Sequence, residues 1–324
     1  MLTSEKFRNH LGYVLAMVMI LLAAVTAAAA APIHGRIVFV SDRTGSYQIY
    51  TMNPDGSEQV QVTNLAPTSV DLLAPSLSPN GQQIVFDYDS GDGPDIYAIN
   101  VDGSDLRQIT SDHGSLLPRW SPDGRRIIFT GTSKLGTGVL TTIAADGSGR
   151  RRVLTTDLWD SFEGIYTPDG KHIVFASQMG GLISAVWIMD ADGSHQRRLT
   201  SAALIGFAWS VSPDGKHILL QSHQNSPPAL DNGIFVMNLD GSGLKQLVKQ
   251  KQFHHDLYPS YSPAGTEIVF LSDRLSSDIG ADTYGTFDVF TIDADGANLT
   301  DVLPAAGQCP NDGNCVTPFW GTAP

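Results

Sequence analysis

The chain has 324 residues, of which 42% are hydrophobic, 16% charged and 8% aromatic. This apolar content supports a sizeable folded core and excludes a chain that is disordered throughout. The formal charge is -13, from 20 Lys and Arg against 33 Asp and Glu, which argues against a nucleic-acid-binding protein because such proteins need a basic face.

The N-terminal segment has the pattern of an export signal. Lys6 and Arg8 form a short basic region, and residues 11–31 carry no charge and end in alanines before Pro32. Small residues at that point suit a cleavage site, so we predict a signal peptide over residues 1–31 and a mature chain over residues 32–324. The alternative is an uncleaved membrane anchor, because an apolar run of this length can span a bilayer. Both predict an exported protein, periplasmic or secreted.

From Gly35 onward one pattern of two strands occurs six times. The first strand is rich in Ile, Val and Phe, which is typical of a buried β-strand. It recurs at residues 37–41, 84–88, 127–131, 173–177, 218–222 and 268–272. The second strand follows each at residues 48–53, 95–100, 139–144, 185–190, 233–238 and 288–293.

Two turns of fixed composition separate these strands. Ser-Pro-Asp-Gly or a close variant precedes the first strand at residues 78–81, 121–124, 167–170, 212–215 and 262–265. Asp-Gly follows the second strand, with glycines at 56, 103, 147, 193, 241 and 296. Pro suits a turn position of fixed φ and Gly one of positive φ, so both predict chain reversals. Repeats of this length with short strands indicate the four-stranded blades of a β-propeller.

The two ends of the chain complete one repeat between them. The first repeat lacks an inner strand, and the chain ends with residues 318–321, Pro-Phe-Trp-Gly, which match the inner-strand segment Pro-Arg-Trp-Ser at 118–121. We expect the C-terminal strand to be the inner strand of the first blade, which closes the ring. The predicted fold is all-β, a six-bladed β-propeller of four-stranded antiparallel blades closed by the C-terminal strand.

Two segments carry a resemblance to a known family. Residues 118–124 are Pro-Arg-Trp-Ser-Pro-Asp-Gly, and residues 37–43 are Ile-Val-Phe-Val-Ser-Asp-Arg. Both are similar to the repeat of the TolB-like six-bladed β-propeller family, and the similarity extends from about Ile33 over nearly the whole remaining chain. The resemblance implies the propeller fold. It covers the propeller only, without the N-terminal domain that precedes the propeller in TolB.

The long connections of the repeats are expected on one face of the propeller, which we call the loop face; the Ser-Pro-Asp-Gly and Asp-Gly turns form the opposite, turn face. The long connections span residues 87–95, 155–164, 222–232, 249–259, 271–287 and 303–318. Dissimilar polar residues converge on the loop face, and we predict a partner-binding site there around one opening. Its residues are Asp42, Arg43, His113, His254, His255, Asp256, Asp273 and Arg274. We expect charge reversal at Asp256 and Asp273 to weaken binding without lowering the melting temperature.

One acidic connection is a weak candidate for a metal site. Asp87, Asp89 and Asp92 offer closely spaced oxygen ligands of the kind that calcium prefers. The favoured alternative is a solvated turn, because the segment lacks the distal Glu of an EF-hand. A second candidate for a divalent metal is a histidine set of His113, His223 and His254.

The sequence predicts a binding module more readily than an enzyme. We find no G-x-S-x-G, H-E-x-x-H or phosphate-binding glycine motif. We expect an exported, monomeric module for a protein or peptide partner in the cell envelope, with no cofactor, no nucleic acid and no stable membrane insertion after cleavage. The alternative is a divalent-metal-dependent enzyme similar to polysaccharide lyases, or a carbohydrate-binding protein, that uses the loop face.

Cys309 and Cys315 are the two cysteines of the chain and lie close together near its end. In the oxidising compartment that export implies, such a pair favours one local disulfide. A metal site would need further ligands, and no Cys or His flanks the pair.

Overall fold

The computed structural model describes residues 35–66, 74–179, 184–200, 204–224, 232–248, 254–275, 287–302 and 315–323. The predicted signal peptide and Cys309 lie outside these residues, as does the side chain of Cys315, so export and the disulfide stay predictions. Residues 34–324 form one compact unit. Within its described segments, no helix is long and apolar enough to cross a membrane.

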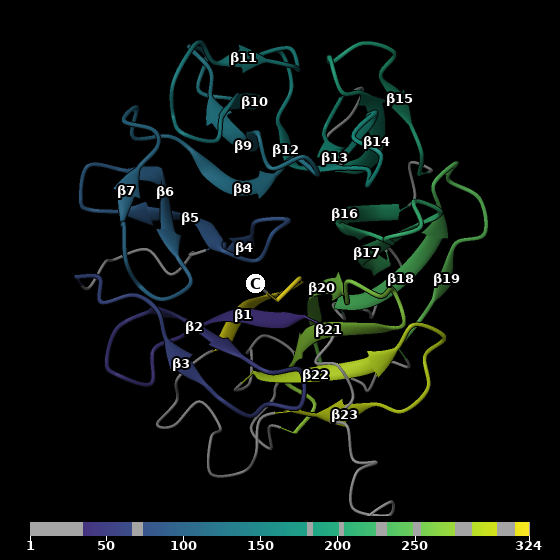
Figure 1. Cartoon of the computed structure of the whole chain (residues 1–324). Helices are drawn as coiled ribbons and strands as arrows, with labels where there is room; N and C mark the ends of the chain where they lie inside the picture. The colour runs from purple at the N-terminus through teal and green to yellow at the C-terminus, as the bar shows by residue number, and fades with distance from the viewer. Residues whose placement is uncertain are drawn as a thin grey trace, which may run out of the picture. The chain divides into compact units, whose positions relative to one another are not determined.

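The described strands form six four-stranded antiparallel sheets, which we number as blades 1 to 6 (Figure 1). The inner strands of blades 1 to 6 are β24 (Cys315–Gly321), β4 (Ser76–Leu77), β8 (Leu116–Trp120), β12 (Ser161–Tyr166), β16 (Leu204–Val211) and β20 (Asp256–Tyr261). The second strands are β1 (Arg36–Ser41), β5 (Gln83–Asp89), β9 (Arg126–Thr132), β13 (His172–Ser177), β17 (His217–Gln224) and β21 (Glu267–Ser272). The third strands are β2 (Gln48–Met52), β6 (Pro94–Asn100), β10 (Gly138–Ala144), β14 (Ala185–Asp190), β18 (Asn232–Asn238) and β22 (Asp288–Asp293). The outer strands are β3 (Val60–Gln61), β7 (Arg107–Gln108), β11 (Arg152–Val153), β15 (Arg197–Arg198), β19 (Lys245–Gln246) and β23 (Thr300–Asp301).

The ring closes as the sequence predicts. β24 pairs with β1, and the register places Ile37 opposite Trp320 and Val38 opposite Phe319. Figure 1 shows the yellow C-terminal strand beside the purple β1, with the C-terminus near the centre of the ring. The all-β, six-bladed propeller closed by the C-terminal strand is therefore confirmed.

The apolar core lies between neighbouring blades. Phe129 of blade 3 is fully buried and packs with Val85 and Ile96 of blade 2 in one cluster. Another cluster joins Phe39 and Trp320 of blade 1 to residues of blade 6. Full burial of one such side chain contributes about 1.5–3 kcal/mol, so each blade depends on its neighbours for stability.

The threonine that ends the repeat has a structural role in four blades. Its hydroxyl accepts a hydrogen bond from a backbone N–H of the third strand, at 2.8–3.0 Å. These threonines are Thr63, Thr110, Thr155 and Thr200. A buried N–H that would otherwise lack an acceptor is thereby satisfied, which holds the chain to the blade after the short outer strand.

We expect Trp320→Ala to lower the free energy of unfolding by about 3–5 kcal/mol, because Trp320 is 3% exposed and fills the seam between blades 1 and 6. Trp159→Ala is the matched control: Trp159 is 40% exposed, and its loss should cost within about 0.5 kcal/mol. Urea denaturation of both variants measures the difference. Equal costs would contradict the proposed role of the closing strand.

Candidate functional site

Blade 6 carries a compact polar cluster on the loop face, centred on the buried Asp273. The Asp273 carboxylate accepts hydrogen bonds from the backbone N of His255 at 2.7 Å and pairs with His255 Nδ1 at 2.9 Å. His254 Nδ1 lies 3.0 Å from the carbonyl oxygen of Asp273. Asp273 follows β21, and both histidines precede β20, so the cluster joins the ends of two adjacent strands of one blade.

Arg274 and Asp256 form a second pair in the same blade. Arg274 donates to Asp256 Oδ1 at 2.6 Å and to Ser272 Oγ at 2.9 Å. Its guanidinium lies over the rings of Phe270 and Phe290, at 5.6 and 5.3 Å from their centroids. Burial raises the pKa of Asp256, and the charge of Arg274 opposes this change. The arginine therefore covers the end of the blade core as well as binding a carboxylate.

The equivalent arginine of blade 1 is held in the same way. Arg43 donates through Nε to Ser41 Oγ at 3.0 Å, and its guanidinium lies over Phe39 and Tyr50. A further bond goes to Gln59 Oε1 rather than to a carboxylate. The repeated Ser-Asp-Arg sequence thus positions an arginine over two aromatic rings.

His113 lies at the connection of blades 2 and 3. Its Nδ1 is 3.1 Å from Asp95 Oδ2, and its side chain is 48% exposed. Asp95 is buried and also accepts from Thr110 Oγ1 at 2.9 Å and from the backbone N of Asp112 at 3.0 Å. Of the imidazoles predicted to contact a partner, this one is the most open to solvent.

The eight predicted partner-binding residues lie in three parts of the ring. Blade 6 holds His254, His255, Asp256, Asp273 and Arg274; blade 1 holds Asp42 and Arg43; the connection of blades 2 and 3 holds His113. The contact between β21 of blade 6 and β24 of blade 1 shows that these two blades are neighbours. Asp256 and Asp273 are 2% and 0% exposed, so a charge reversal there removes internal hydrogen bonds. Because such hydrogen bonds contribute to stability, we expect these charge reversals to lower the melting temperature as well, and contact of these residues with a partner stays a prediction.

The three aspartates of the calcium candidate do not face one point. Asp87 is fully enclosed in β5, accepts from the backbone N of Ala74 at 3.1 Å and has a pKa raised by burial to about 6. Asp89 accepts from the backbone N of Gly91 at 2.7 Å and of Gly93 at 2.9 Å, which shapes the turn. Across the described segments, no group of three or more His, Cys, Asp or Glu side chains could hold a metal ion. The side chain of His223, from the alternative histidine set, lies outside the described residues.

Three apolar side chains that the sequence pattern did not predict as a site are exposed on the loop face; Leu135, Leu158 and Trp159 are called the apolar patch. Their exposed fractions are 67%, 70% and 40%. Leu135 lies between β9 and β10, and the other two lie between β11 and β12. Two hydrogen bonds of 2.8 Å tie these loops together, from Thr137 Oγ1 to the Asp157 carbonyl and from Gly138 N to Asp160 Oδ1. The sequence signal for this patch is the presence of large apolar residues inside short, otherwise polar loops.

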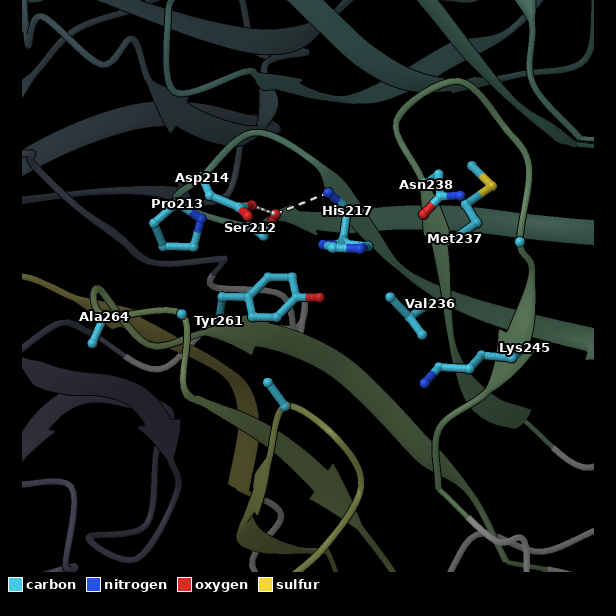
Figure 2. Close-up of a pocket in the computed structure, with 13 residues that line it drawn as sticks. Ser212, Pro213, Asp214, His217, Val236, Met237, Asn238, Lys245, Tyr261 and Ala264 are labelled. Atoms are coloured by element: carbon cyan, nitrogen blue, oxygen red, sulfur yellow. Dashed lines mark hydrogen bonds between the residues drawn. The ribbon is translucent and has the colours of Figure 1, made fainter.

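A pocket of about 510 Å³ lies between blades 5 and 6 on the turn-face side (Figure 2). Ser212 donates to Asp214 at 2.6 Å and accepts from the backbone N of His217 at 2.9 Å, as the dashed lines in Figure 2 mark. Burial raises the pKa of Tyr261, in the pocket wall, to about 12, so its phenol stays neutral. Blades 3 and 4 form a pocket from the same repeat positions, including Tyr166. A pocket that recurs with the repeat is a product of blade packing.

The inner strand of blade 4 carries a carboxyl group with one oxygen enclosed by the protein. Glu163 lies at the β-bulge of β12 with a φ of 57°, and its Oε2 has no hydrogen-bond partner in the described part of the chain. It lines a small internal space together with Arg119 and Trp209. Burial raises the pKa of Glu163 to about 8, and the charge of Arg119 opposes this shift.

A family model and several relatives match this chain. A family model described as the TolB beta propeller domain matches residues 22–158 and 66–232. The Tol-Pal system protein TolB of Anaeromyxobacter dehalogenans is 37% identical over 100 residues, which are 30% of this chain and 20% of that protein. The chain thus matches about a fifth of the length of the first curated relatives.

Two solved structures show the same fold. TolB from Acinetobacter baumannii has a TM-score of 0.71 at 23% identity, covering 94% of this chain and 71% of that one. A putative TolB from Agrobacterium tumefaciens has a TM-score of 0.64 at 19% identity, covering 88% of this chain and 98% of that one. At such identities the likeness concerns the fold, and the site must be argued from its own residues.

Asp273→Asn should lower the free energy of unfolding by about 1–3 kcal/mol, because an amide cannot satisfy both donors of His255 as a carboxylate does. Asp105→Asn is the control, since Asp105 is exposed and makes a surface ion pair of little energetic value. Chemical denaturation at pH 7 compares the two. A cost at Asp273 no larger than at Asp105 would show that the cluster is not a structural unit.

Glu163→Gln should make stability less dependent on pH. The unfolded glutamate titrates near about pH 4.3, whereas the folded pKa is about 8. Between these values the folded state binds more protons, so the free energy of unfolding falls as pH rises. Relative to wild type, the Gln variant should therefore gain about 3–4 kcal/mol from pH 5 to pH 8. Urea denaturation of both proteins at the two pH values measures this, and a constant difference would refute it.

Proposed function

Since the chain belongs to the TolB β-propeller family, we propose that it is an exported binding module that docks a protein or peptide partner in the cell envelope through its loop face. The leader-like pattern of residues 1–31 supports export to the periplasm or beyond. The relatives named as Tol-Pal system proteins support a role in an assembly of proteins.

The apolar patch of Leu135, Leu158 and Trp159 is the observation that carries this proposal. Large apolar side chains that are open to solvent and close to one another mark interaction surfaces in soluble proteins. Trp in particular anchors protein interfaces, because it buries a large area at low conformational cost. A carbohydrate or metal site would require polar groups converging on one point, and the patch offers apolar area instead.

The patch is also preorganised for binding. Leu135 N donates to Ser133 Oγ at 3.1 Å and Leu158 N to Thr156 Oγ1 at 3.0 Å, so each loop tip has a defined turn. The exposed Lys134 and Asp157 stand beside these leucines in sequence and supply a polar rim of both charges. A partner that docks here orders little of this chain, which limits the entropic cost of association.

Site-specific photocrosslinking in cells tests the proposal. A photoreactive phenylalanine analogue at position 158 should give a discrete protein adduct, and Trp159→Ala should reduce its yield at least about tenfold, as expected for a hot-spot residue. The same analogue at position 153 is the control, because Val153 is 57% exposed on the outer strand of the same blade.

Comparing the adducts from positions 158 and 153 shows whether a partner binds the loop face in particular or the surface in general. A single adduct from position 158, absent from position 153, supports a specific envelope partner. Equal adducts from both positions, or no protein adduct from 158 in exported protein, would overturn the proposal.

A further inference from the structure

Six equivalent residues of the inner strands surround the axis of the propeller. Each is paired in register with the middle of the second strand of its own blade, for example Arg119 with Ile128 and Phe319 with Val38. The six are Phe319, Ser76, Arg119, Ile165, Ser210 and Ser260 in blades 1 to 6. Figure 1 shows the inner strands arranged around the centre of the ring. The repetition of the blade thus brings residues that are more than 200 positions apart in sequence together around the axis.

These residues line a cavity of about 330 Å³ that opens on the turn face. All six blades contribute to its wall, and its mouth is formed by the prolines of the turns, Pro79, Pro122, Pro168, Pro213 and Pro263. The volume is within the range of small-molecule sites in proteins. The near-identity of the turns in sequence favours binding on the loop face, but these turns also enclose a space in the structure.

Arg119 is the charged member of this ring. Its guanidinium donates to the carbonyl oxygen of Pro118 at 3.0 Å and lies 5.7 Å from the centroid of the Phe319 ring. Among the described residues no ion pair joins it to a carboxylate, although Glu163 and Asp87 influence it electrostatically. A guanidinium has five N–H donors in a fork that matches a carboxylate, so Arg119 has capacity for an anion.

The neighbouring carboxyl groups leave this charge largely available at neutral pH. Burial lowers the pKa of Arg119 only to about 10, so the guanidinium stays protonated. Burial raises the pKa of Glu163 to about 8, so this group is mostly neutral. Asp87, with a pKa of about 6, is ionised at pH 7 and accepts from the backbone of Ala74.

The rest of the wall is suited to an apolar body. Phe319, Trp209, Ile165 and Leu77 line the same cavity, and serine hydroxyls lie at three of the six ring positions. The net charge of -13 repels polyanions at long range, which favours a ligand with a single negative charge. The Arg119 guanidinium, surrounded by apolar side chains, is therefore complementary to a ligand that carries one negative charge on an apolar group.

We propose that the axial cavity binds an apolar carboxylate, with the carboxylate on Arg119 and the apolar group against Phe319 and Trp209. The carboxylate can belong to a free small molecule or to the C-terminus of a peptide. This site is separate from the loop-face patch and does not depend on the partner proposed for it.

Fluorescence titration of the purified protein with 8-anilinonaphthalene-1-sulfonate tests the charge requirement, with the uncharged N-phenyl-1-naphthylamine as the matched probe. Wild type should bind the anionic probe saturably at one site. Arg119→Met should weaken that binding at least about tenfold, corresponding to about 1.4 kcal/mol, and change binding of the neutral probe less than about twofold. Arg119→Lys should retain most of the affinity, which separates loss of charge from loss of fold.

Arg125→Met is the control variant, because Arg125 is exposed in the turn beside the cavity mouth and its loss changes the net charge equally. Equal affinity of wild type and Arg119→Met for the anionic probe, or an equal loss in Arg125→Met, would overturn the proposal.

Competition identifies the source of the carboxylate. Displacement of the probe by phenylacetate alone indicates a small molecule, and displacement by a peptide ending in Leu-Phe, but not by its C-terminal amide, indicates a peptide end. Failure of both carboxylates to displace the probe would also overturn the proposal.

Discussion

Closure of the ring through the pairing of β24 with β1 is the interaction on which the other features of this protein depend. It joins Ile37 to Trp320 and brings the two ends of the propeller into one sheet. A blade cannot bury both of its faces alone, so each completes the core of its neighbours. The cluster between blades 1 and 6 contains Trp320 of the closing strand, which makes that seam dependent on the last residues of the chain.

The closed ring also determines where chemistry can occur. It directs the connections between β9 and β10 and between β11 and β12 to one face, where Leu135, Leu158 and Trp159 are exposed. It directs one residue of every inner strand to the axis, where Arg119 differs from its neutral counterparts. In a structure of near-identical units, specificity lies in the positions at which one unit departs from the others.

The candidate site was predictable in part. The Ser-Asp-Arg of residues 41–43 and 272–274 identified polar residues at equivalent strand ends, and the structure adds the pair of Arg274 with Asp256. The burial of Asp273 did not follow from the sequence, because it depends on His254 and His255 from the segment that precedes β20. Leu158 and Trp159 stand in a polar loop of the sequence, but only the fold shows that little covers them.

The sequence by itself determined the blades, their order, the turns between them and the strand that closes the ring. These features rest on local patterns: alternating apolar residues, proline and glycine at turns, and a repeat that recurs along the chain. The tertiary structure decided which polar groups are buried, which apolar side chains are left exposed, and that Arg119 faces an axial cavity. Each of these depends on side chains contributed by different blades, and a contact between blades is a property of packing that no single segment of sequence contains.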